Sequence, residues 1–122
     1  MKIAIFGKAF ATEFDDAVKH ILRRIEEIDP NPLVEAAFMR MLDDRMNVSD
    51  QLRSFEEHHE LKGCDFLVAI GGDGTVLEAA TWVRESEIPV LAVNTGRLGF
   101  LSNVGIEEID LAMDALAAGR VW

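Results

Sequence analysis

The stretch Phe66-Leu67-Val68-Ala69-Ile70-Gly71-Gly72-Asp73-Gly74-Thr75 joins an uninterrupted apolar run to a glycine loop that contains one carboxylate. An apolar run of this kind is typical of a strand that is covered on both faces in a parallel sheet. A glycine loop after such a strand brings backbone N–H groups close to phosphate, and an acidic side chain there repels the ligand unless it has its own task. Asp73 is therefore either a reactive group or a residue that stabilises the loop.

Strand and helix patterns alternate on both sides of this stretch. We expect strands at residues 2–6, 66–70 and 88–93, because each is a short apolar run. After the first strand, apolar residues recur at helical spacing, which predicts a helix that begins at Thr12 and ends at Pro30. Thr12 and Asp15 have the spacing of a capping box. Two further helices are expected, one after the glycine loop and one that starts near residue 107 and ends at Gly119. The apolar face predicted for the helix after the loop is Val76, Leu77, Ala80 and Val83.

The segment of residues 31–61 gives a weaker signal. Asn31 and Pro32 resemble a cap and a first helical residue, although the apolar run of residues 33–38 is also compatible with a strand. Ser49 indicates a second cap before a shorter element. The adjacent His58 and His59 do not share one face of a helix or strand, so we interpret them as part of a solvated turn rather than a metal site.

The alternation predicts an α/β fold in which a mostly parallel, doubly wound, Rossmann-like sheet has helices on both faces. In such sheets ligands bind outside the carboxyl ends of the strands. The glycine loop follows one strand, and a second loop, Asn94-Thr95-Gly96-Arg97-Leu98-Gly99-Phe100-Leu101, follows the next. We therefore expect both loops to line one crevice.

Composition excludes several classes of protein. A formal charge of −10 over 122 residues argues against a sequence-independent nucleic-acid binder, which needs clustered Lys and Arg. No apolar run approaches the roughly 20 residues that cross a bilayer, and the N-terminal apolar stretch is too short for a signal peptide. The lone Cys64 fits a buried thiol in a reducing compartment. We expect a cytoplasmic protein with no nucleic-acid or membrane partner, and we interpret Lys8, Arg84 and Arg97 as solvated charges.

Two common nucleotide motifs do not fit the glycine loop. The dinucleotide-binding fingerprint needs a third glycine where Leu77 stands, and the P-loop needs a Gly-Lys-Ser or Gly-Lys-Thr that the chain lacks. An aspartate between glycines can instead accept the proton of a hydroxyl and align it for attack on a phosphoryl group. The glycines could also serve only a tight turn with positive φ, with Asp73 as a helix cap.

The two loops together resemble those of the NAD kinase family, which phosphorylates the 2′-hydroxyl of the adenosine ribose of NAD. Gly71-Gly72-Asp73-Gly74-Thr75 alone is shared with diacylglycerol kinases, sphingosine kinases and, in related form, 6-phosphofructokinases. The second loop, which ends in Leu98-Gly99-Phe100-Leu101 at this distance from the first, is what singles out NAD kinase.

The resemblance implies roles for individual residues. Asp73 matches the proposed general base toward the 2′-hydroxyl, and Gly71, Gly72, Gly74 and Thr75 match the turn that lines the phosphate and ribose site. Leu77 and Phe100 match positions that line the adenosine pocket of NAD. Asn94 matches the head of the second loop and is expected to lie near the bound nucleotide. A divalent cation, expected to be Mg²⁺, would accompany ATP or another polyphosphate as the phosphoryl donor, and no residue is assigned as a metal ligand.

The resemblance also implies a domain organisation. Residues 1–122 correspond to the N-terminal α/β nucleotide-binding domain, and we expect a β-rich NAD-binding domain, with an Asn-Glu pair, to lie outside this chain. The fragment alone is then expected to be inactive, and the full-length protein to be a homo-oligomer, a dimer or tetramer. Two alternatives stay open, namely another GGDGT-type kinase acting on a lipid or sugar phosphate, and a nucleotide-binding module without chemistry.

Overall fold

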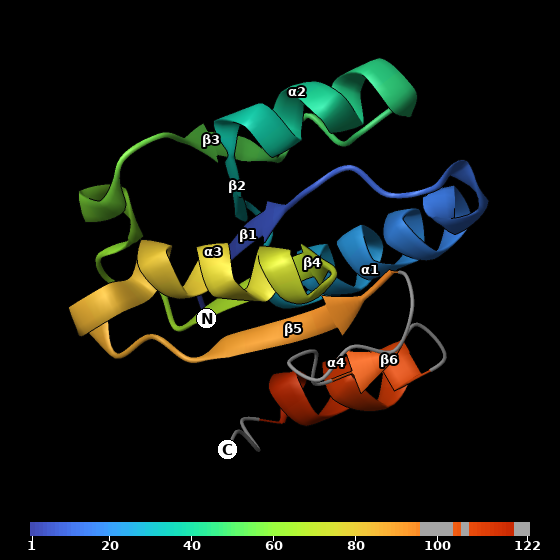
Figure 1. Ribbon diagram of the computed structural model, residues 1–122. Helices are drawn as coiled ribbons and strands as arrows, with labels where there is room; N and C mark the ends of the chain where they lie inside the picture. Colours follow the sequence, from blue (N-terminus) through green and yellow to red (C-terminus); the bar gives the residue numbers. More distant parts are fainter. Residues whose placement is uncertain (96–103, 106–107, 119–122) are drawn as a thin grey trace.

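The computed structural model describes residues 1–95, 104–105 and 108–118, and these residues form an α/β fold around one sheet (Figure 1). The sheet has six strands in the order β3-β2-β1-β4-β5-β6, and every neighbouring pair is parallel. The strands are β1 (Ile3–Gly7), β2 (Leu33–Glu35), β3 (Arg53–Phe55), β4 (Phe66–Gly71), β5 (Val90–Asn94) and β6 (Val104–Gly105). The helices are α1 (Asp15–Ile28), α2 (Ala36–Arg45), α3 (Asp73–Val83) and α4 (Ile109–Ala117), with short 3-10 turns at Thr12–Phe14, His58–Leu61 and Arg84–Ser86. The predicted fold class is confirmed.

Alternating side chains of the central strands fill two separate hydrophobic layers. In β4, Phe66, Val68 and Ile70 join the layer that α1, α2 and α4 cover, whereas Leu67 and Ala69 face the opposite layer under α3. This is the period of two that a strand imposes, and burial on both faces explains why the sequence of β4 is apolar throughout. Figure 1 shows α3, in yellow, in front of β1 and β4.

The order of the strands reverses between β1 and β4. From β1 the chain proceeds outward through β2 to β3, then returns to the other side of β1 and proceeds outward through β4, β5 and β6. The carboxyl ends of β1 and β4 lie next to each other, because Gly7 and Ile70 are register partners. A crevice at such a reversal is where parallel α/β sheets bind ligands. The glycine loop, which follows β4 directly, is at this point.

Two predictions in the segment of residues 31–61 are corrected. The segment does not begin with a helix at Asn31. The alternative that the run of residues 33–38 begins as a strand is the one observed, since the chain forms β2 and turns into α2 at Ala36. There the Glu35 carboxylate accepts hydrogen bonds from the backbone N–H groups of Ala37 and Phe38 at 3.0 Å each. Glu35, not Asn31, is thus the cap of this helix. The element after Ser49 is the three-residue strand β3 and not a helix.

The ends of the predicted helices also differ from expectation. The capping box at Thr12 is not formed; a 3-10 turn precedes α1, and neither N-cap residue has a side-chain hydrogen bond. The apolar face of α4 is as predicted, since Ile109, Ala112, Met113 and Leu116 are all buried. Gly119, expected to end α4, lies outside the described residues. Within the described parts of the chain, no helix is long and apolar enough to cross a membrane.

Candidate functional site

Gly71 makes the sharp turn that leads from β4 into α3. Its φ is +154°, a backbone conformation that side chains with a Cβ atom rarely adopt. A Cβ atom added at this position would lie 2.2 Å from the Thr75 Oγ1 atom, well inside van der Waals contact. The fold itself therefore requires glycine at position 71.

Gly72 and Gly74 are different, because nothing in the described structure requires them to be glycine. Gly72 has a φ of −99° and a ψ of −162°, which other residues adopt, and neither position has a positive φ. A Cβ atom added at either residue would meet no atom within 4 Å, and both residues are exposed. Two glycines that packing does not explain leave open space above the backbone, which is what the close approach of a ligand needs.

The backbone places Asp73 at the start of α3. Gly72 is the N-cap residue, and its carbonyl accepts hydrogen bonds from the N–H groups of Thr75 and Val76 at 3.1 and 3.2 Å. Asp73 is thus the first helical residue, which corrects the alternative that it serves as the helix cap. This position puts Asp73 at the positive end of the helix dipole, where a carboxylate is favoured. Its catalytic role stays a prediction.

The second loop begins beside the first, as predicted. Asn94 is the register partner of Gly71 across β4 and β5, and the Thr95 backbone N–H donates to the Gly71 carbonyl at 3.3 Å. Asn94 and Thr95 are buried, although both are polar. The rest of this loop, residues 96–101, lies outside the described residues, and with it Arg97 and the predicted adenosine contact Phe100. The convergence of the two loops is confirmed at their first residues.

The inner face of α3 is shifted from the predicted one. Thr75, Ala79 and Val83 are buried, whereas Leu77 is 61% exposed and Ala80 is also exposed. The buried residues recur every four positions along the helix, as one helical face requires. An exposed leucine one turn after the glycine loop is available to a ligand; its predicted contact with adenosine is not tested by this geometry.

Lys8, interpreted from the sequence as a solvated charge, lies beside the candidate site. It follows β1 directly, and its backbone N–H donates to the Ile70 carbonyl at 3.2 Å, beside the glycine loop. Its ammonium lies 3.1 Å from the Glu78 carboxylate on α3 and 5.5 Å from the centre of the Phe6 ring. The sequence indicates neither contact, although the position of Lys8 at the end of a central strand is a usable signal. An exposed ion pair of this kind is weak, so the ammonium can change partners at little cost.

The other residues singled out in the sequence have ordinary structural roles. His58 packs against the Trp82 ring with 4.6 Å between ring centres, and its Nδ1 lies 3.1 Å from the Trp82 carbonyl oxygen. Cys64 is buried, and desolvation raises the pKa of its thiol, as expected for an unreactive core cysteine. No three His, Cys, Asp or Glu side chains of the described residues gather as a metal site. Arg84 is at the opposite end of α3 from the loop.

Comparison with known proteins agrees with this geometry. The sequence profile described as the ATP-NAD kinase N-terminal domain matches residues 8–121. The NAD kinase of Flavobacterium johnsoniae is 36% identical over 93% of the chain, and that of Geobacter metallireducens is 38% identical over 97% of it. The chain spans 39% of the length of each of these relatives. Yeast NADH kinase, whose crystal structure was solved as a complex with NADH, has the same fold over 98% of the chain, with a TM-score of 0.78 and 23% sequence identity.

Proposed function

The chain belongs to the family of ATP-NAD kinase N-terminal domains, and we propose that it forms the catalytic half of an NAD kinase. The complete enzyme transfers a phosphoryl group from ATP or another polyphosphate to the 2′-hydroxyl of the adenosine ribose of NAD, and the product is NADP. The chain alone is inactive in this proposal, since both substrates need a wall of the cleft that a second, β-rich domain supplies.

The observation that carries the proposal is the open backbone at Gly72 and Gly74. Among the described residues, neither backbone conformation nor packing requires these glycines, and they flank the one acidic residue of the loop. They stand at the reversal of the strand order, beside the buried start of the second loop. A nucleotide can approach the backbone there closely enough for a carboxylate at position 73 to reach a ribose hydroxyl.

In the proposed reaction, Asp73 acts as general base. Its carboxylate accepts the proton of the 2′-hydroxyl while the hydroxyl oxygen bonds to the terminal phosphorus of the donor. The bond between that phosphorus and the bridging oxygen breaks, and the shortened polyphosphate, ADP when ATP is the donor, leaves with the electron pair. Positioning and charge stabilisation account for most of the rate of such transfers, so the rigid turn at Gly71 matters as much as the base.

A divalent cation, Mg²⁺ in this proposal, fits the residues present. Mg²⁺ in phosphoryl transferases is held largely by substrate phosphates, water and one or two carboxylates, so it needs no dedicated cage of protein ligands. Bound with the donor, it would neutralise the charge of the phosphates. Lys8, whose ammonium contacts Glu78 and the Phe6 ring, would add a positive charge at the same edge of the sheet. We also propose that the protein is cytoplasmic, in agreement with its lone buried cysteine. We propose in addition that the full-length protein is a homo-oligomer.

The test is product formation by the complete gene product. The wild-type protein should convert NAD and Mg-ATP to NADP, and Asp73→Asn should lower the turnover by roughly 10²- to 10⁴-fold with an unchanged circular dichroism spectrum. Asp43→Asn, the same substitution at an exposed position of α2, is the matched control and should have wild-type activity. Turnover of a lipid or of a sugar phosphate in place of NAD would assign the protein to the wider GGDG group of kinases. Wild-type activity of Asp73→Asn would exclude the base.

A further inference from the structure

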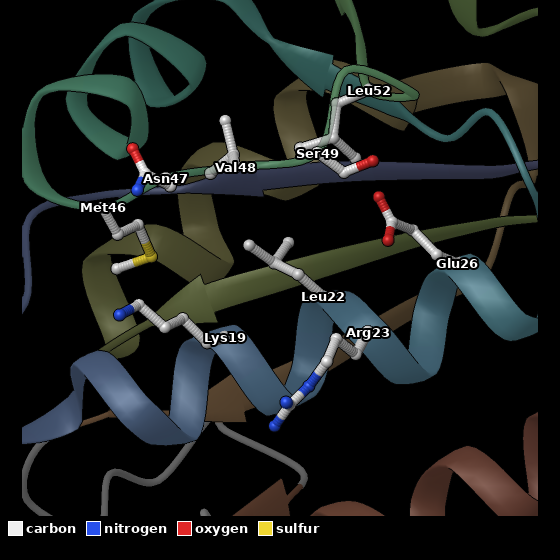
Figure 2. Close-up of a pocket in the computed structure, with 9 residues that line it drawn as sticks. All are labelled: Lys19, Leu22, Arg23, Glu26, Met46, Asn47, Val48, Ser49 and Leu52. Carbon is white, nitrogen blue, oxygen red and sulfur yellow. The ribbon is translucent and has the colours of Figure 1, made fainter.

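A cavity of about 310 Å³ lies beside α1, and no residue of the glycine loop lines it. It separates α1 from the connection that runs from α2 to β3 (Figure 2). None of its lining residues belongs to β1, β4 or α3, so the proposed kinase site does not account for it.

The floor of the cavity is apolar. Leu22 of α1 points into it, and Met46, Val48 and Leu52 close it from the connection (Figure 2). Leu22, Met46 and Leu52 are buried, and Val48 is partly buried. A small apolar side chain of a ligand would lose its contact with water here.

The two ends of the cavity carry opposite charges. Lys19 and Glu26 are seven residues apart on α1, which corresponds to about 10.5 Å along a helix. In Figure 2 the Lys19 ammonium extends toward the end beside Met46, and the Glu26 carboxylate points across the gap toward Ser49, whereas the Arg23 guanidinium is directed away. Neither Lys19 nor Glu26 forms an ion pair with any residue that the structure describes.

Glu26 is the less ordinary of these two charges. Its Oε1 atom is buried and has no hydrogen-bond partner among the described residues. A shielded carboxylate oxygen without a donor is costly, and the cost falls when a positively charged donor binds the same carboxylate. Glu26 is partly buried, and a cation bound at this end of the cavity would give its Oε1 atom a donor.

The backbone along the cavity also has unused donors. Met46 is extended, with a φ of −154° and a ψ of 158°. The N–H groups of Asn47 and Val48 donate no hydrogen bond within the described part of the chain. An extended peptide laid along this segment could accept these bonds, as an added strand does at the edge of a sheet.

We propose that this cavity binds a short zwitterionic peptide in an extended conformation, about three residues long and with an apolar central side chain. Three extended residues span about 10 Å, which is close to the rise along α1 between the backbones of Lys19 and Glu26. The peptide ammonium binds the Glu26 carboxylate, the peptide carboxylate binds the Lys19 ammonium, and the central side chain rests on Leu22. This site is independent of the proposed kinase activity.

The test uses the tripeptide Ala-Leu-Ala and isothermal titration calorimetry on the complete gene product. Glu26→Gln should weaken the binding of Ala-Leu-Ala by roughly tenfold, because it removes a charge-assisted hydrogen bond. It should not weaken the binding of N-acetylated Ala-Leu-Ala, which has no ammonium. Lys19→Gln should in turn affect Ala-Leu-Ala but not its C-terminal amide. Glu13→Gln, the same substitution at an exposed residue outside the cavity, is the matched control.

The comparison between peptides does not depend on whether a protein variant folds. On the wild-type protein alone, acetylation and amidation should each weaken binding roughly tenfold. Equal affinity for the free and the blocked peptides would overturn the proposal, as would the absence of binding at millimolar Ala-Leu-Ala, which would leave the cavity to water. Neither outcome bears on NADP formation, so the two proposals fail separately.

Discussion

Alanine at Gly71 and alanine at Gly74 should have opposite effects on stability, because the two glycines exist for different reasons. At position 71 the backbone has a φ of +154°, and a Cβ atom would collide with the Thr75 side chain at 2.2 Å. The strained conformation costs about 1–3 kcal/mol and the collision a similar amount, so Gly71→Ala should lower the free energy of unfolding by about 2–6 kcal/mol. A loss of this size removes much of the stability of an ordinary domain.

Gly74 is a helical residue with open space above it, so its replacement should stabilise the fold. Alanine restricts the unfolded chain and favours the helix, which should raise the free energy of unfolding by about 0.5–1 kcal/mol. The same methyl group would stand where the proposed nucleotide approaches the backbone, and misplacement of a substrate by about 1 Å can cost 10²-fold in rate. Gly74→Ala should therefore be more stable and about 100-fold less active. Position 72 is a less clean test, because alanine is a poor N-cap residue.

Urea-induced unfolding of the complete gene product, measured for the wild type and both variants in one buffer, gives the stabilities. NADP formation by the same preparations gives the activities. A Gly74→Ala variant that is more stable and fully active would refute the reasoning that Gly72 and Gly74 leave room for a ligand. A Gly71→Ala variant with wild-type stability would refute the collision with Thr75.

Two further predictions concern the scaffold. The buried Asp29 carboxylate accepts the backbone N–H of Ile3 at 2.9 Å, so Asp29→Ala should leave that donor unpaired and lower the free energy of unfolding by about 1–3 kcal/mol, measured by urea unfolding. Asp110 of α4 forms hydrogen bonds with His20 and Arg24 of α1. Both bonds lower the pKa of Asp110, and the bond with His20 has the larger effect. Because the pKa of Asp110 is lower in the folded state than in the unfolded state, ionised Asp110 stabilises the fold at pH values above the ordinary aspartate pKa near 3.9. This contribution to stability is lost as the pH falls through the pKa of the folded state. Wild type should thus be more stable than Asp110→Asn at pH 7, and the difference should shrink as the pH falls below the ordinary aspartate pKa; a difference that grows with acidity would contradict this.

The sequence was sufficient for the elements that carry strong periodicity. β4 is apolar throughout because both of its faces are buried. In α4 the predicted inward residues, namely Ile109, Ala112, Met113 and Leu116, recur at helical spacing and are all buried. The turn between β4 and α3 was also predictable, since the run of glycines after a buried strand has few structural explanations. These elements are the ones that position the candidate site.

The short strands β2 and β3 give only a weak signal in the sequence, in which β2 is one of two alternatives and β3 is not indicated. β2 and β3 have three residues each, too few for a period of two to appear, and two of the three residues of β3 are exposed. The apolar run from Leu33 continues into α2 without a break in hydrophobicity. What changes at Ala36 is the backbone, which turns into a helix where the Glu35 carboxylate caps it, and a hydrophobicity pattern does not record that event.

Within the candidate site, the sequence identified the loop but not its surroundings. The distinction between Gly71, which the fold requires, and Gly74, which it does not, depends on φ and on the distance to Thr75. The pairing of Lys8 with Glu78 joins residues 70 positions apart and follows from the adjacency of β1 and β4, which is a property of the strand order. The face of α3 was misjudged because its buried residues include Thr75 and the small Ala79, which a pattern of large apolar residues does not select.

The central claim is that Asp73 removes the proton of the ribose hydroxyl during phosphoryl transfer. It is tested most directly by a single-turnover measurement of NADP formation in the complete gene product, with wild type and Asp73→Asn at saturating Mg-ATP and with the dissociation constant of NAD measured alongside. We predict that Asp73→Asn slows the chemical step by at least 100-fold and leaves the NAD dissociation constant within about threefold of the wild type. An unchanged chemical step, or a loss of activity that NAD saturation restores, would contradict the claim.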